Sequence, residues 1–145
     1  MIDGNALFFT CSLIELIARE HRLRRRDVVD ALGTEVIRKI LSRADVLHCE
    51  PIAKVAEEIV EHHAIPSGEC ETVAKCRYRI PDYWEIGAVF ARLIEDTAAA
   101  DAASALVMVY RSFLSDAICR FNSDLYYQPR QYLAECLKAG EILAA

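Results

Sequence analysis

Apolar residues recur at helical spacing along almost the entire chain, and this pattern constrains the fold more than any other feature. The first such stretch, from Leu7 to Ala18, is apolar around much of its circumference, which is typical of a central, buried helix. Only five glycines and four prolines interrupt the 145 residues. The sequence therefore predicts an all-α fold, a compact bundle of seven or eight helices in two halves.

Capping residues indicate where several of these helices begin and end. We expect Asn5 to cap the first helix, Thr34 to cap a helix of the first half, and Asp82 to cap the first helix of the second half. Pro129 is expected to open the last helix, and Gly140 to end it.

The clearest break in the helical pattern is Ile65-Pro66-Ser67-Gly68. It predicts an N-terminal helical domain of unknown function over residues 1–64, an irregular connector over 65–81 and a C-terminal helical domain over 82–145. The pattern leaves open whether the two halves share one core.

A second break is predicted inside the first half. Asp45-Val46-Leu47-His48 is expected to be a short extended tetrapeptide between two helices. Pro51 follows at a position suited to start the next helix.

Charge and hydropathy exclude some classes of function. The net charge of −5 gives no basic excess for general nucleic-acid binding, and no apolar run reaches the ~20 residues that span a bilayer. The apolar fraction of 54% is high for a globular protein, so an interface outside the core, including a homo-oligomer interface, is an open alternative.

The six cysteines are expected to be reduced thiols in the cytoplasm. They show no spacing typical of a disulfide framework. The apolar run from Ala6 to Ala18 is interrupted by Glu15 and lacks a basic leader, so no secretory signal is expected.

Possible metal ligands lie within a short span, but their spacing lacks the paired pattern of structural zinc sites. No phosphate-binding loop, nucleophile elbow or metalloprotease motif is present. We therefore predict a protein that is not an enzyme, with no cofactor and no assigned metal site, and keep a small metal-binding protein or enzyme as a further alternative. The possible metal ligands are His48, Cys49, His62, His63, Cys70 and Cys76.

A DNA-binding regulator using residues 25–43 is the main alternative function. This stretch superficially resembles a helix-turn-helix, although the turn around Gly33 is short and the second helix starts with Thr34 and Glu35 rather than base-reading side chains. The four arginines within residues 22–26 suit either a solvated helix end or docking on an acidic or phosphate-bearing partner.

The segment 121–132 is the best candidate for a protein-binding surface. It combines aromatic rings with polar tips, the composition of recognition hot spots. The alternative is that the tyrosines fill a helix junction and bond the backbone through their hydroxyls. The predicted partner-binding residues are Asn122, Tyr126, Tyr127 and Arg130, with Trp84 either supporting them or joining the contact.

Two resemblances cover most of the chain. Residues from about 7 to 64 resemble a small bacterial domain of unknown function, which has an aromatic-rich first helix, a basic or polar turn, a helix of the Asp27-Val28-Val29-Asp30-Ala31-Leu32 type and a closing Asp45-Val46-Leu47-His48. Residues from about 80 to 143 resemble a second uncharacterised bacterial protein type. The matching motifs there are Trp84-Glu85-Ile86-Gly87, Phe121-Asn122-Ser123, Tyr126-Tyr127 and Cys136-Leu137-Lys138-Ala139-Gly140-Glu141-Ile142-Leu143.

In bacterial gene neighbourhoods, both protein types accompany a domain that looks like an ADP-ribosyltransferase. The resemblance therefore implies an accessory role, as an antitoxin-like or otherwise regulatory partner of such an enzyme. The first type usually has another residue than Cys49 after its histidine, so no metal role is carried over. No catalytic residue is carried over either.

Overall fold

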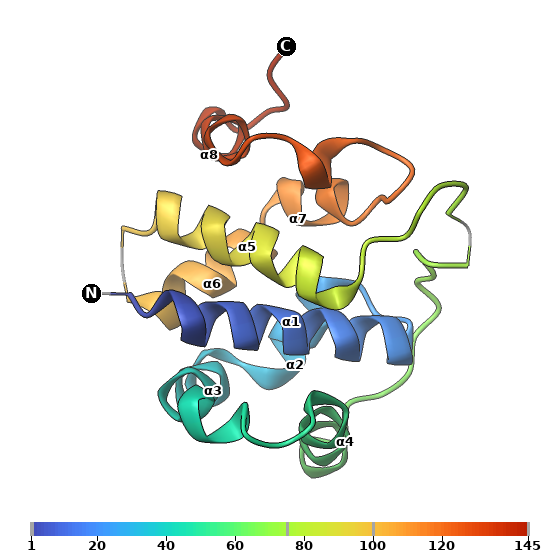
Figure 1. Cartoon of the computed structure of the whole chain (residues 1–145), viewed down its shortest axis with the longest axis vertical. Coiled ribbons are helices and arrows are strands. Elements are labelled where there is room, and N and C mark those ends of the chain that lie inside the picture. Colours follow the sequence, from blue (N-terminus) through green and yellow to red (C-terminus); the bar gives the residue numbers. More distant parts are fainter. Residues whose placement is uncertain (1, 75, 100, 145) are drawn as a thin grey trace.

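The computed structural model describes residues 2–74, 76–99 and 101–144, and these ranges form helices but no β-strand (Figure 1). The predicted all-α fold is therefore confirmed. The elements are α1 (Gly4–His21), α2 (Arg25–Leu32), α3 (Thr34–Leu47), α4 (Ile52–His62), α5 (Tyr83–Thr97), α6 (Ala102–Tyr110), α7 (Phe113–Ile118), the short 3-10 helix η1 (Leu125–Tyr127) and α8 (Arg130–Ala139).

Helices α1 and α5 run side by side through the middle of the bundle, with α3 and α4 on one side and α8 on the other (Figure 1). Helix α1 is buried over most of its circumference, as its sequence predicts. Gly87 on α5 lies against α1 so closely that a Cβ there would be 2.1 Å from Ser12 Oγ and 2.8 Å from Ser12 Cα. The absence of a side chain at this position therefore sets the distance between the two central helices.

The two halves share one hydrophobic core, because the most extensive helix contact joins α1 of the first half to α5 of the second. The predicted connector contains no helix or strand in its described residues. It is nevertheless tied to the end of α1, where the N–H groups of Gly68 and Cys70 donate to the carbonyls of His21 and Arg22, both at 2.8 Å. The division into an N-terminal domain over 1–64 and a C-terminal domain over 82–145 stays a prediction.

Helix ends follow local signals in part. Asp82 and Glu85 form a reciprocal capping box at the start of α5, and Gly140 ends α8 in the left-handed conformation at φ 75°, as predicted. Asn5 does not cap α1. The carboxylate of Asp3 accepts from the N–H groups of Asn5 and Ala6 at 3.0 and 3.2 Å, which places Asn5 inside the helix.

Two further predictions in the first half were wrong in detail. Thr34 is the first residue of α3 rather than its cap, a position that Gly33 takes. The tetrapeptide from Asp45 is not extended, since α3 continues to Leu47 and His48 keeps a right-handed helical conformation. Ala44 is buried and Leu47 half-buried, so the apolar stripe of α3 extends its helical spacing through the segment and keeps it helical.

Candidate functional site

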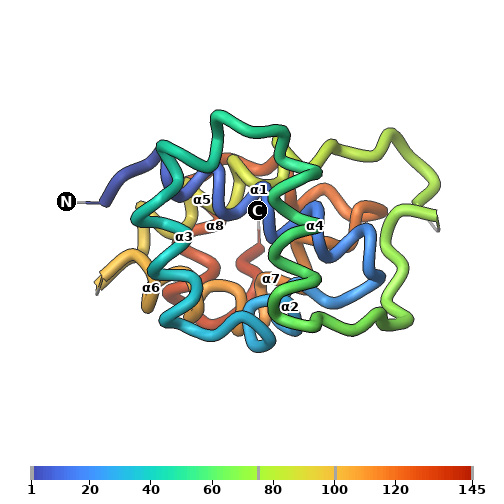
Figure 2. Tube along the Cα trace, turned by 90° about the horizontal axis from the view of Figure 1, so that it is seen from below, coloured from blue at the N-terminus to red at the C-terminus, as the bar shows by residue number. Residues whose placement is uncertain are grey.

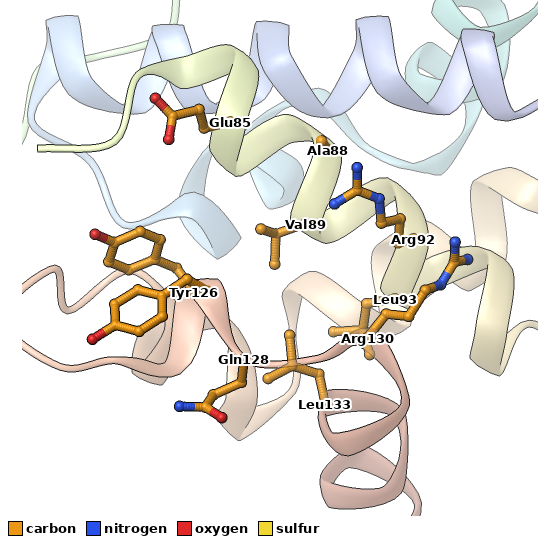
Figure 3. A pocket seen from close by; sticks show the side chains of 10 residues that line it. Glu85, Ala88, Val89, Arg92, Leu93, Tyr126, Gln128, Arg130 and Leu133 are labelled. Carbon is orange, nitrogen blue, oxygen red and sulfur yellow. The ribbon is translucent and has the colours of Figure 1, made fainter.

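A groove of about 430 Å³ lies between α5, η1 and the start of α8, and it contains three of the five predicted partner-binding residues (Figure 3). We call it the tyrosine groove. Its lining consists of Glu85, Ala88, Val89, Arg92, Leu93, Tyr126, Tyr127, Gln128, Arg130 and Leu133.

The floor of the tyrosine groove is apolar and its two ends are polar. Val89 and Leu133 lie between the helices in the middle of the groove, with Tyr126 at one end and Arg92 and Arg130 at the other (Figure 3). The α5 residues of the lining recur at intervals of three and four, so one face of this helix forms a whole wall. This wall was not predicted from the sequence, although the helical spacing of α5 contains it.

The two tyrosines form edge-to-face ring contacts at their end of the groove. Tyr126 is half-buried, and its ring meets those of Phe121 and Tyr127 edge to face, at centroid distances of 6.1 and 4.9 Å. Tyr127 is 66% exposed, although large aromatic side chains are usually covered. The Tyr126 ring is thus packed between Phe121 and Tyr127, while Tyr127 presents its ring to solvent.

The two arginines at the other end differ in their pairing. Arg130 donates from Nε and Nη2 to the Asp96 carboxylate at 2.9 and 2.7 Å, and this bidentate hydrogen bonding raises the pKa of its guanidinium. Arg92 is exposed and forms no ion pair within residues 2–74, 76–99 and 101–144. The groove therefore offers one fixed cation and one that is available to a ligand.

Asn122 and Trp84 do not line this groove. The Asn122 side chain accepts a hydrogen bond from the Arg77 N–H at 2.7 Å and so ties the connector to the loop before η1. Trp84 is 37% exposed and packs against Phe8 and Tyr83, each at a centroid distance of 5.3 Å. The predicted surface is thus divided between a groove and two separate packing positions.

The arginine run at residues 22–26 turns inward at one position. Arg25 is 2% exposed and donates to both carboxylate oxygens of Glu15, which is fully buried in α1. Arg19 donates to the same carboxylate at 2.7 Å. Both guanidinium groups lie over the ring of Phe121, at 4.9 Å for Arg19 and 5.7 Å for Arg25. Neither sequence-based interpretation of the run holds for Arg25, because its role is internal.

We call Glu15, Arg19 and Arg25 the buried ionic cluster. Burial by itself raises the pKa of Glu15, but the charges and hydrogen bonds of the two arginines outweigh burial and leave the pKa below its ordinary value. The thiol of Cys119 lies 3.8 Å from Glu15 Oε1, and burial raises its pKa. Burial also raises the pKa of the Cys11 thiol, to about 12.

The structure gives little support to the alternative functions, DNA binding and metal binding. Of the five basic residues in 25–43, Arg25 is buried, Arg26 is half-buried and Arg38 pairs with Glu35 and Asp101, which leaves Lys39 and Arg43 as exposed cations. No group of three or more His, Cys, Asp or Glu within the described ranges is arranged to hold a metal ion. All six cysteines are described, and each is a free thiol.

None of the helices in the described ranges is long and apolar enough to cross a membrane.

Comparisons with protein-family models, with curated proteins and with solved structures found no match to this chain.

Proposed function

We propose that this protein is a helical protein-binding module that docks on a partner through the tyrosine groove. The observation that carries the proposal is the pairing of an exposed ring, Tyr127, with a half-buried neighbour, Tyr126, beside an apolar floor. A tyrosine side chain has few rotatable bonds and so loses little conformational entropy on binding, which lets it serve as an anchor.

The proposed partner is an enzyme, and the role is antitoxin-like or regulatory. The resemblances described above support this, since they imply an accessory to an ADP-ribosyltransferase-like enzyme. The mechanism would be physical obstruction: the helical surface would cover the partner's active cleft while Arg92 pairs with an acidic group at its edge. The proposal places both proteins in the cytoplasm, where free thiols stay reduced.

The test is affinity capture from the native host, followed by mass spectrometry and a binding measurement with the recovered partner. Tyr127→Ala should weaken that binding by about 2 kcal/mol or more, the loss typical of a hot spot. Tyr78→Ala is a matched control, because Tyr78 is also 66% exposed but lies outside the groove. Equal affinities of the two variants for the partner would contradict the proposal.

A further inference from the structure

A second groove, of about 330 Å³, lies between α3 and α4, in the other half of the molecule. The two helices are joined by residues 48–51 only, yet they barely touch one another, because α4 packs mainly on α1 whereas α3 packs on α1, α6 and α2. Figure 2 shows them side by side, with α1 behind the space between them. We call this the α3–α4 groove, and its lining is Val36, Lys39, Ile40, Arg43, Leu47, Val55, Glu58, Ile59, His62 and His63.

The floor of the α3–α4 groove is apolar and only partly covered. Ile40 and Val55 are buried against the core, whereas Val36, Leu47 and Ile59 stay half-buried. The lining residues recur at intervals of three and four on both helices, so the groove runs along one complete face of each. An apolar floor between two helix walls is the shape that receives an amphipathic helix.

The rim of the groove on α3 carries two exposed cations. Lys39 and Arg43 are exposed and form no ion pair with any residue in the described parts of the chain. They lie four residues apart on one helix face, where like charges repel one another and destabilise the helix. Their neighbour Arg38, by contrast, pairs with Glu35 and Asp101. An acidic ligand would relieve the repulsion.

The rim on α4 adds the imidazole groups of His62 and His63, which can form hydrogen bonds, and the carboxylate of Glu58. The rings of His62 and His63 meet edge to face at 4.8 Å and lie at the end of the groove lining on α4. Glu58 is the acidic member of the lining, and Lys54 lies 4.0 Å from its carboxylate. The charge that faces a ligand across the groove is therefore mainly positive, although the whole chain carries a net charge of −5.

We propose that the α3–α4 groove binds an acidic amphipathic helix of a partner protein. The apolar face of that helix would cover Val36, Leu47 and Ile59, and its carboxylates would pair with Lys39 and Arg43. A nucleic acid would meet the same two cations but would leave the apolar floor uncovered, so the floor favours a peptide. This groove is separate from the tyrosine groove and does not depend on the function proposed for it.

The experiment uses the full chain and a fluorescein-labelled synthetic peptide of about 16 residues, longer than the roughly three turns that line the groove on α3. The peptide has leucine at helical spacing on one face and glutamate on the other. A scrambled peptide of the same composition and a labelled DNA duplex are the comparison ligands. Binding is measured by fluorescence anisotropy at low and high salt, with circular dichroism of each variant as the check on folding.

The informative variant is Lys39→Glu/Arg43→Glu, and Lys39→Ala/Arg43→Ala serves if charge reversal impairs folding. The matched control is Arg77→Glu/Arg120→Glu, which reverses two exposed cations outside the groove. We expect the amphipathic peptide to bind wild type and the control pair alike. It should bind the groove variant at least about tenfold more weakly, with affinity falling as salt rises. Tyr127→Ala should leave this affinity unchanged, which separates the proposal from that for the tyrosine groove.

Three outcomes would overturn the proposal. The first is no binding of the amphipathic peptide to wild type, and the second is equal binding of the scrambled peptide. The third is tighter binding of the DNA duplex that depends on Lys39 and Arg43, which would make the groove a nucleic-acid site.

Discussion

The buried ionic cluster and the tyrosine groove contain the same kinds of side chain, in opposite surroundings. In the cluster, Arg25 pairs with Glu15 over the ring of Phe121 and is 2% exposed. In the groove, Arg130 pairs with Asp96 at the end opposite Tyr126, and its side chain is 47% exposed. Removing charges from water is costly unless they are paired, whereas water can replace an exposed partner. The comparison indicates that the cluster acts on stability and that the groove is free to act on binding.

The largest effect is expected from breaking the buried pair. Arg25→Met leaves the Glu15 carboxylate with Arg19 as its remaining basic partner, so we expect the free energy of unfolding to fall by about 3–5 kcal/mol in urea titrations. Arg24→Met is the matched control, because Arg24 pairs with Asp116 while 45% exposed and should contribute less than about 1 kcal/mol. Equal losses in the two variants would remove the distinction between buried and exposed pairs.

Acid should weaken the same cluster. Because the pKa of Glu15 in the folded protein lies below its ordinary value of 4.5, its contribution to stability is complete above that pH. The contribution is lost as pH falls through the lower pKa of the folded state. Urea titrations at a series of pH values from neutral to about pH 3 should show this loss. The free energy of unfolding should depend less steeply on pH in Glu15→Gln than in wild type. An unchanged slope in the variant would assign the acid response to other carboxylates.

Exposed and buried cysteines should differ in their reactivity, an effect that is local and smaller than those on stability. Cys49 is exposed and should react at once with a thiol reagent, whereas Cys11 and Cys119 are buried. The raised pKa of Cys11, from 9.0 to about 12, leaves its thiolate fraction about a thousandfold lower than that of an ordinary cysteine. Labelling followed by mass spectrometry should therefore find both buried thiols protected until the protein unfolds. Early labelling of Cys119 would show that the cluster opens in the native state.

The smallest effect on stability is expected in the groove itself. Tyr127→Ala and Arg92→Ala remove exposed side chains, so each should change the free energy of unfolding by no more than about 0.5 kcal/mol. The same substitutions are expected to reduce partner binding. A large loss of stability in either variant would mean that the groove is part of the structural core, contrary to the comparison.

Features encoded by neighbouring residues could be predicted from sequence. The cap at Asp82 and the end of α8 at Gly140 each depend on a few consecutive residues, and both predictions were confirmed. The extended tetrapeptide was wrong because Pro51 restricts only the residue before it, while Leu47 continues the apolar stripe of α3. A local break was thus inferred where tertiary packing keeps the helix intact.

The ionic cluster and the outline of the groove depend on the angles between helices. In the sequence Glu15 is only an interruption of an apolar run, because the position of Arg25 beside it follows from how α2 packs on α1. Tyr126, Tyr127 and Arg130 were predicted as one surface and do share a groove. Their function as a binding surface stays a prediction. Arg92 was missed because the packing of α8 on α5 decides which face of α5 forms the wall.

The contact between Gly87 and Ser12 has a consequence for how this sequence tolerates mutation. Any side chain at position 87 would meet the backbone of α1, which cannot yield as a flexible side chain could. Because α1 and α5 form the central pair, separating them would loosen the core shared by both halves. A saturation library at this codon, sorted for folded protein, should therefore return glycine almost alone, whereas the exposed position of Tyr127 should accept most residues.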